Sequence, residues 1–341
     1  MVPLTPDAIY RMYSNTKIVT SVAAMMLYEE GRLGLDQPLR EVLPAFADVK
    51  VLKRKAAGID DVEELASPVL MRHILSHSAG FSYGFVEPES AIDQAYMAHG
   101  LDPLGNREDT LESMCDKLAK MPLVYQPGTS WRYSLATDVT ARVVELLSGQ
   151  RFDEFLKDRI FTPLSMVDTD FHVPADKVGR FITMYAPTDL LDPMKPGLVK
   201  ADDAHEGQYN SPRAMLSGGG GLVSTVSDYL SFLRMIVSGG SWNGVRLLEP
   251  ETLDVMRTNQ LAGGIGVSFP MWDMPGTVFG LGFALKQQLS EGEPLASLGE
   301  YHWGGMAGTH SWMAPETGIT GFCLTQRMPG FWHPFSHEFK R

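Results

Sequence analysis

Long hydrophobic segments are missing from this sequence. The longest apolar stretch, Ile18–Tyr28, is interrupted by Thr20 and Ser21, and it is far shorter than the roughly twenty residues that a membrane-spanning helix needs. The first residues, Met1-Val-Pro-Leu-Thr-Pro-Asp7, lack the basic and apolar regions of a secretory leader. We therefore expect no membrane association and, provided that Met1 is the natural start, a cytoplasmic location.

Cysteine and basic residues are also scarce. Cys115 and Cys323 are the only cysteines, and they stand in no metal-ligand spacing. Because Cys323 lies in the apolar run 319–324, we expect it to be a small buried hydrophobic residue, although a single disulfide stays open. Lysine and arginine total 29 against 41 acidic residues, a formal net charge of −12. This balance argues against a nucleic acid partner, which requires a basic face to replace counterions.

Motifs for metal and phosphate binding are absent as well. His73 and His77 have the i, i+4 spacing of a zinc-binding helix but lack the glutamate of H-E-x-x-H, so we interpret both as structural. The run Ser217-Gly-Gly-Gly-Gly221 lacks the Gly-Lys-Ser/Thr ending of a phosphate loop. We interpret it as backbone that needs unusual dihedral angles. We expect no metal and no cofactor.

Helical patterns are clear ahead of residue 240. Residues 16–30 predict a helix that ends at Gly31, and its wide apolar girth indicates burial on most sides. Residues 135–148 place apolar side chains on one face, with Gly149 as the stop. A further helix is predicted over about 225–237, with Ser224 as its N-cap.

Strand patterns dominate the last third of the chain. Residues 278–285, 301–303, 309–313 and 319–325 predict four strands, and the turn-rich Pro315-Glu-Thr-Gly318 joins the last two. Helices first and strands last, with hairpin connections, predict an α+β fold with an antiparallel sheet.

Ser14-Asn-Thr-Lys17 is the focal chemical motif. Positions i and i+3 of a helix share a face, so the Lys17 amine can reach the Ser14 hydroxyl. Ser14 in the first turn also places its own N–H at the positive end of the helix dipole. Base catalysis needs a neutral amine in at least one step, a form that burial among the following apolar residues favours. The motif thus offers a nucleophile, a candidate base and one oxyanion donor, although the spacing alone is weak evidence.

Two other segments can complete such a site. Tyr133-Ser-Leu135 precedes the helix predicted over 135–148, whose dipole favours a phenolate; beside Lys17, Tyr133 would be an acid/base partner. The alternative is a tyrosine with a buried ring and a wet hydroxyl. Trp303-Gly304-Gly305 lies on a predicted strand, where two glycines mark a bulge or the close approach of a ligand or backbone. The N–H of Met306 would then be a second oxyanion donor.

In this order and at these separations, the three elements resemble those of family VIII carboxylesterases, relatives of class C β-lactamases and D-alanyl-D-alanine peptidases. Flanking segments are similar over essentially the whole chain, at residues 9–14, 29–33, 75–81, 126–129, 220–224 and 280–283. The resemblance implies that Ser14 is acylated, that Lys17 and Tyr133 share the general-base work, and that Trp303 replaces a lysine of β-lactamases. Which of Lys17 and Tyr133 takes the serine proton stays open.

The same resemblance implies a β-lactamase/transpeptidase-like architecture, with an antiparallel sheet flanked by helices plus a mostly helical domain. Residues 1–32 and 206–341 would form the α/β domain, residues 33–205 the mainly helical domain, and the active site would lie between them. Family members usually begin well before the serine motif. The chain therefore predicts either a trimmed start or a smaller sheet covered by a second subunit, hence a possible homo-oligomer.

Two departures from the β-lactamase pattern bear on the substrate. Leu135 stands where β-lactamases carry asparagine, and Trp303-Gly304-Gly305 stands where they carry Lys-Thr-Gly. Both changes remove polar groups that would bind the amide and carboxylate of a β-lactam. We therefore rank a carboxylesterase for short-chain esters above a β-lactamase, a D-alanyl-D-alanine peptidase-like amidase or an acyltransferase. A non-catalytic binding module is disfavoured because all three motif positions are filled.

Overall fold

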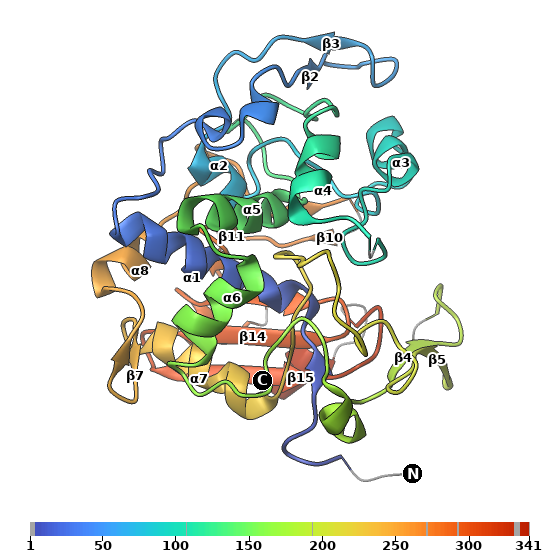
Figure 1. The fold of residues 1–341 in the computed structure, drawn as a ribbon, viewed down its shortest axis with the longest axis vertical. Coiled ribbons are helices and arrows are strands. Elements are labelled where there is room, and N and C mark those ends of the chain that lie inside the picture. Colours follow the sequence, from blue (N-terminus) through green and yellow to red (C-terminus); the bar gives the residue numbers. More distant parts are fainter. Residues whose placement is uncertain are drawn as a thin grey trace.

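The last third of the chain forms a five-stranded antiparallel sheet with the order β11-β12-β13-β14-β15 (Figure 1). The computed structural model describes residues 4–106, 108–192, 194–270, 272–291, 293–330 and 335–340. The sheet strands are β11 (Thr277–Phe279), β12 (Ala284–Lys286), β13 (Tyr301–Gly305), β14 (Thr309–Ala314) and β15 (Ile319–Leu324). Each strand pairs with the next in sequence, which confirms the predicted antiparallel sheet and its last three strands.

The single strand predicted over 278–285 is wrong, because the chain folds there into the β11–β12 hairpin. Gly282 in the turn has φ +101° and donates its N–H to the Leu75 carbonyl at 3.0 Å. A Cβ at this glycine would lie 2.3 Å from Ser21 Oγ. The turn itself is buried, and Leu281 within it is fully inaccessible. Because its residues are therefore hydrophobic, the sequence over 278–285 resembles one continuous strand.

Helix α1 (Thr16–Glu29) packs against α5 (Ala136–Ser148) and crosses the molecule beside the sheet (Figure 1). Every residue from Thr16 to Leu27 is buried, which confirms the expected burial on most sides. Gly31 and Gly149 follow the two helices with φ of +69° and +76°. Both predicted glycine stops are therefore confirmed.

The remaining helices surround this centre. They are α2 (Met71–Leu75), α3 (Ala91–Ala98), α4 (Leu111–Leu118), α6 (Phe152–Leu156), α7 (Val226–Val237), α8 (Pro250–Met256) and α9 (Phe335–Lys340). Helix α7 was predicted, but its N-cap is Thr225 and not Ser224, because the Thr225 side chain accepts the Asp228 N–H. Thr225 is the residue with extended backbone directly before the first helical turn.

Short two-stranded pairs also occur among the described residues. They are β1 (Tyr10–Arg11) with β6 (Val223–Ser224), β2 (Val51–Leu52) with β3 (Val62–Glu63), β4 (Met184–Pro187) with β5 (Leu198–Asp202), β7 (Ser241–Trp242) with β8 (Val245–Arg246), and β9 (Ser268–Phe269) with β10 (Trp272–Asp273). The β1–β6 pair fixes the chain just before Ser14.

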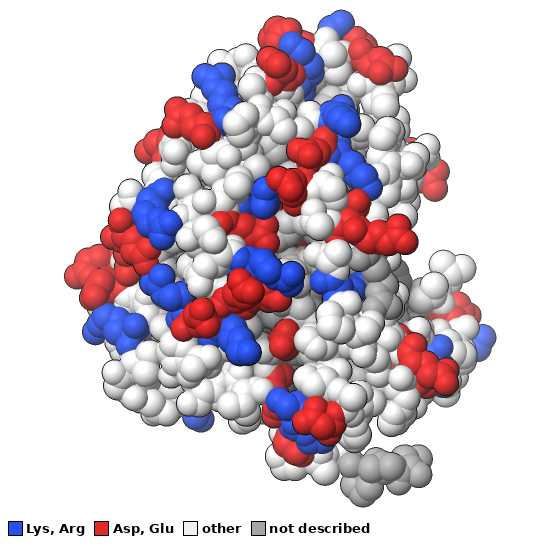
Figure 2. All heavy atoms as spheres, viewed as in Figure 1, with Lys and Arg blue, Asp and Glu red and all other residues white. Residues whose placement is uncertain are grey.

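One main hydrophobic core extends from α1 through the helical segment into the sheet. The α+β fold class is confirmed by this arrangement, whereas the domain boundaries at 32/33 and 205/206 stay a prediction. Cys115 and Cys323 are both free and buried, as expected for Cys323. Across the described ranges, every helix is too short or too polar to traverse a bilayer. Acidic and basic side chains are interspersed over the face shown in Figure 2.

Candidate active site

Ser14 lies in a single 3-10 turn, Tyr13–Asn15, that leads directly into α1. Tyr13 has φ +45°, an uncommon value for a residue other than glycine. The preceding carbonyl, that of Met12, accepts the Thr309 hydroxyl of β14 at 3.0 Å. Contacts on both sides therefore hold the serine at the tip of a buried helix, and its own side chain stays partly exposed.

Lys17 lies one turn further along, with Nζ 3.5 Å from Ser14 Oγ. Its side chain is 1% exposed. The amine donates to the Gly219 carbonyl at 2.6 Å and to the Tyr83 hydroxyl at 3.0 Å. It also lies 4.6 Å from the centre of the Tyr133 ring. The amine is thus fixed from several sides within reach of the serine.

Tyr133 approaches the serine from the segment before α5. Its hydroxyl donates to Ser14 Oγ at 2.6 Å, and Trp303 Nε1 donates to the same hydroxyl at 3.3 Å. The tyrosine ring is buried. The structure therefore brings Tyr133 from a distant part of the chain to Ser14 and Lys17, as the sequence predicts.

The Trp303–Met306 segment forms the end of β13 and the turn after it, beside the serine. A Cβ on Gly305 would lie 2.3 Å from the Met12 carbonyl oxygen, and one on Gly304 would lie 2.1 Å from the His310 ring. Glycine is required because the strand passes so close to the Ser14 segment and to β14. The expectation of a close backbone approach is therefore confirmed.

A cavity of about 740 Å³ opens over these residues. Ser14, Tyr133 and residues 303–306 line one side of it. Phe85, Val86 and Phe269 add an apolar wall, and the Phe269 ring lies 5.6 Å from that of Tyr133. A mainly apolar wall with a few convergent polar groups is the usual form of a small-molecule site.

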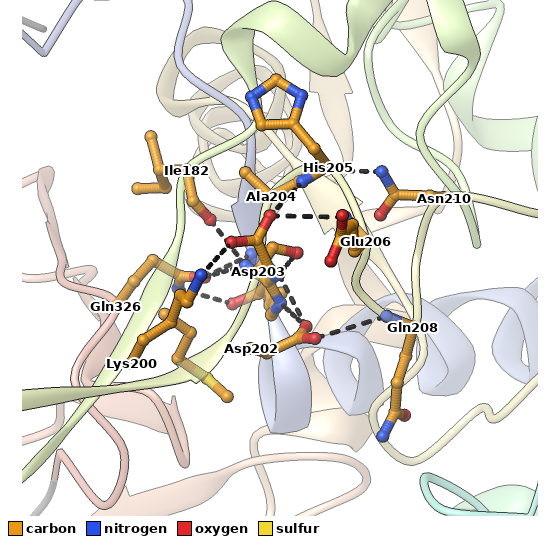
Figure 3. A network of polar contacts seen from close by, with 12 residues as sticks. Ile182, Lys200, Asp202, Asp203, Ala204, His205, Glu206, Gln208, Asn210 and Gln326 are labelled. Atoms are coloured by element: carbon orange, nitrogen blue, oxygen red, sulfur yellow. Dashed lines mark hydrogen bonds and ion pairs between the residues drawn. The ribbon is translucent and has the colours of Figure 1, made fainter.

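The strand that leads to Ser14 is anchored by Arg11, which is completely buried. Its guanidinium donates to Asp202 Oδ2 and to the Ile182 carbonyl, both at 2.7 Å. Gln326 Oε1 accepts the Arg11 backbone N–H at 3.0 Å. Figure 3 shows Asp202, Ile182 and Gln326 converging in this network from three separate segments. Arg11 thus ties the serine-bearing strand to the region around β4 and β5.

Residues 1–336 match the protein family described as Beta-lactamase. The chain belongs to the β-lactamase family. This result confirms the resemblance drawn from the motifs, and with it the β-lactamase/transpeptidase-like fold and the serine hydrolase class.

Three similar proteins align with most of this chain. Protein Rv1367c of Mycobacterium tuberculosis (strain ATCC 25618 / H37Rv) is 32% identical over 96% of this chain and 80% of its own length. Esterase EstB of Burkholderia gladioli is 30% identical over 95% of this chain and 78% of its own length. The solved structure of EstCE1, described as a hydrolase with promiscuous acyltransferase activity, superimposes with a TM-score of 0.79. It is 25% identical, over 96% of this chain and 82% of its own.

Tyr83 and Gly219 contact the lysine of this β-lactamase-family site, and sequence reasoning missed both. Burial, followed by the nearby Asp138 carboxyl, raises the pKa of Tyr83 well above its usual value, so its hydroxyl stays protonated. The only signal for Tyr83 was its position two residues after the family-like segment 75–81. The signal for Gly219 was the glycine run, which we interpreted differently.

The interpretation of Gly218–Gly221 as backbone with unusual dihedral angles is wrong, since none of these glycines has a positive φ. The cause is close packing. A Cβ on Gly218 would lie 2.6 Å from Ala141 Cβ, and one on Gly219 would lie 2.6 Å from Asp138 Oδ2. The loop needs glycine because it passes between α5 and Lys17.

The two histidines set aside from the sequence have structural partners. His73 Nδ1 accepts the Leu70 N–H at 3.1 Å, and desolvation, followed by the Arg72 charge, lowers the pKa of His73 to about 4. The His77 ring packs 5.0 Å from the Tyr133 ring. Among the residues that the structure describes, no group of three or more His, Cys, Asp or Glu side chains could hold a metal ion.

A second serine must be excluded because Gly80-Phe-Ser82-Tyr-Gly84 has the Gly-x-Ser-x-Gly pattern of a nucleophile elbow. Ser82 is completely buried. Its hydroxyl donates to Asp93 Oδ1 at 2.5 Å and accepts from Arg132 Nε at 2.7 Å. A strand–turn–helix elbow does not surround it, so Ser14 is the candidate nucleophile.

Proposed function

We propose that the protein is a carboxylesterase that hydrolyses short-chain esters through an acyl-Ser14 intermediate. The observation that carries the proposal is the 2.6 Å contact between Tyr133 Oη and Ser14 Oγ, with Lys17 Nζ 3.5 Å from the same oxygen. An amine and a phenol at these distances can share the proton that Ser14 must lose.

The proposed reaction has two halves. Ser14 Oγ attacks the ester carbonyl carbon while its proton passes to the Lys17/Tyr133 pair. The N–H groups of Ser14 and Met306 stabilise the oxyanion. The pair returns the proton to the alcohol oxygen as the C–O bond breaks, and water then attacks the acyl-serine in the same way. Because Lys17 and Tyr133 interact closely, the proton belongs to the pair and not to either residue alone.

Two findings favour esters over β-lactams. Leu135 is completely buried and offers no side-chain hydrogen bond to a β-lactam amide, and the Trp303 indole bonds to Tyr133. Among the relatives, Esterase EstB is named for ester cleavage. A second candidate, acyl transfer to an alcohol, is supported by the promiscuous acyltransferase activity ascribed to EstCE1.

The decisive kinetic experiment uses p-nitrophenyl acetate and butyrate with stopped-flow detection. We expect a burst of nitrophenol followed by slower turnover, because acylation and deacylation are separate steps. S14A should lose both phases, whereas S231A, a change on the outer side of α7, should keep them. Turnover by S14A above a few per cent of the wild-type rate would refute the assignment.

The same protein preparation separates the alternatives. Added methanol or butanol that diverts most of the product from acid to ester would favour acyl transfer. Turnover of nitrocefin at a rate similar to that of the esters would favour the amidase alternative.

We also propose that the protein forms a homo-oligomer and that it is cytoplasmic. Support for the oligomer comes from the exposed apolar side chains on the β4–β5 region, among them Leu191, Leu198 and Val199. Sedimentation velocity should show a species larger than one chain, and a well-folded monomer at all concentrations would contradict the proposal.

A further inference from the structure

Asp138 is a fully buried carboxyl close to the catalytic pair, in the first turn of α5. Its Oδ1 accepts the Ser217 hydroxyl at 2.6 Å and the Gly219 N–H at 3.0 Å. Its Oδ2 has no hydrogen-bond partner among the described residues. A buried carboxylate oxygen without a donor is costly, so a nearby charge is needed to stabilise it.

Gly219 connects this carboxyl to Lys17. Its N–H donates to Asp138, and its carbonyl accepts from Lys17 Nζ at 2.6 Å. A Cβ on Gly219 would lie 2.6 Å from the unpartnered Asp138 Oδ2 and 2.8 Å from the Tyr83 hydroxyl. Since Tyr83 is itself hydrogen-bonded to Lys17, Asp138 Oδ2 is on the same side of the loop as the amine.

Groups from three other elements face Asp138. Lys17 faces it from α1, Tyr83 from the segment after α2, and Cys115 from α4. Burial raises the pKa of both Tyr83 and Cys115, so these two stay neutral near pH 7. Burial also raises the pKa of Asp138, and the Lys17 charge opposes that effect. Lys17 is the charge that most strongly opposes the effect of burial on this carboxyl, whereas Arg142, one turn later on α5, is paired with Glu112 and Glu145.

We propose that Asp138 is the fixed counter-charge of Lys17 and a positioning residue for the acylation of Ser14. It holds the Gly219 loop, whose carbonyl directs the amine toward Ser14 and Tyr133, and it compensates the ammonium form inside the core. This inference rests on the proposed function. The proton shared by Lys17 and Tyr133 then moves within a site whose charges are balanced. This balance lowers the free-energy cost of burying the Lys17 charge.

The first test compares Asp138→Asn with Glu145→Gln. Asparagine keeps the acceptor for Ser217 and Gly219 but removes the negative charge. The control substitution Glu145→Gln removes one negative charge about two turns later on α5. Asp138→Asn should reduce kcat at least tenfold with KM within a factor of two, since Asp138 is not among the described residues that line the cavity. The acid limb of its kcat/KM profile should move by about one pH unit to lower pH, the effect of losing one buried opposite charge. Glu145→Gln should leave the profile in place.

An acid limb of Asp138→Asn that superimposes on that of the wild type would overturn the proposal. If the wild-type enzyme itself shows no ester turnover, the proposed function fails, and the pairing must be tested without activity.

The second test, which needs no activity, is a double-mutant cycle on thermal unfolding with Lys17→Met and Asp138→Asn. Each single change should lower Tm because it leaves the other group buried without compensation. Adding Asp138→Asn to Lys17→Met should raise Tm above that of Lys17→Met alone. Equal decreases in Tm from Asp138→Asn in both backgrounds would show that the two groups act independently and would overturn the proposal.

Discussion

Lys17 is a buried amine whose surroundings replace the water that would otherwise solvate it. The Gly219 carbonyl and the Tyr83 hydroxyl accept from Nζ at 2.6 and 3.0 Å, and both bonds are shorter than the 3.5 Å contact with Ser14. The partners that fix the amine are therefore not the residues with which it would exchange a proton. This separation lets the lysine stay in place while the Ser14 proton moves.

Replacing Tyr83 by phenylalanine tests this division of roles. Loss of the hydroxyl that accepts from Lys17 should lower the free energy of unfolding by about 1.5–3 kcal/mol, the usual value for a hydrogen bond to a charged group. Ester turnover should fall as well, because the amine can leave its place beside Ser14. Urea denaturation and initial rates measure the two effects.

Tyr125→Phe is the matched control, because the Tyr125 hydroxyl donates to the neutral His77 carbonyl. Its cost should be only about 0.5–1.5 kcal/mol, as for an ordinary hydrogen bond, and its turnover should not change. Equal effects of the two variants would mean that Tyr83 has no special relation to the amine.

The sequence indicates some of these residues and not others, and the difference has a physical reason. Ser14, Lys17 and Tyr133 are the residues that we propose to carry the chemistry, so residue type and spacing indicate them. Tyr83, Asp138 and Gly219 are proposed to act through Lys17, and only the packing of α1, α5 and the glycine loop brings them to it. Asp138 lies in the first turn of α5, where the helix dipole favours an acidic residue in any case, and its contact with the glycine loop is not visible in the sequence.

At the scale of elements, local signals predicted helix ends better than loops. Gly31 and Gly149 end α1 and α5 with positive φ, because a left-handed residue after a helix is a local requirement. The β11–β12 hairpin and the 218–221 loop depend on what lies against them, namely α1 and α5. The space around these glycines is set by tertiary contacts, which a single sequence does not record.

Gly219→Ala tests whether the loop requires glycine because a larger residue would not fit. Its added methyl group would meet Asp138 Oδ2 at 2.6 Å and the Tyr83 hydroxyl at 2.8 Å. We expect a loss of about 1–3 kcal/mol in the free energy of unfolding, as for other overpacked cores, together with reduced ester turnover. Chemical denaturation and steady-state kinetics measure both.

Gly179→Ala is the control, since a Cβ at Gly179 has no neighbour within 4 Å. It should be neutral or slightly stabilising because alanine restricts the unfolded chain. A Gly219→Ala variant as stable and as active as Gly179→Ala would contradict the close packing of the loop against the site.

For the molecule as a whole, the site depends on contacts between segments far apart in sequence. Ser14 follows a strand that Arg11 ties to residues 182, 202 and 326, and the walls of the cavity above it include residues near 85, 133, 269 and 303. The fold class and the central residues were predictable from motifs. The shape of the cavity was not, because it depends on how these and the other lining regions pack.

Arg11→Met should destabilise the whole protein. It removes the guanidinium from a fully buried position and leaves the Asp202 carboxylate without its partner. Breaking a fully buried ion pair costs about 3–5 kcal/mol; because Asp202 is partly exposed, we expect a loss near the lower end of this range, which calorimetry or urea denaturation would detect. Lys200→Met, which breaks an exposed pair with Asp203 in the same region, should leave Tm unchanged. Similar decreases in both variants would show that Arg11 is not the anchor of the serine-bearing strand.

We propose that Lys17 and Tyr133 activate the Ser14 oxygen for covalent chemistry. The most direct test of this proposal is intact-protein mass spectrometry after treatment with a fluorophosphonate, followed by peptide mapping. We expect one adduct per chain, located on Ser14, that is absent in S14A and forms far more slowly in K17M and Y133F. An adduct on another serine, or labelling of Ser14 at the wild-type rate in both K17M and Y133F, would contradict it.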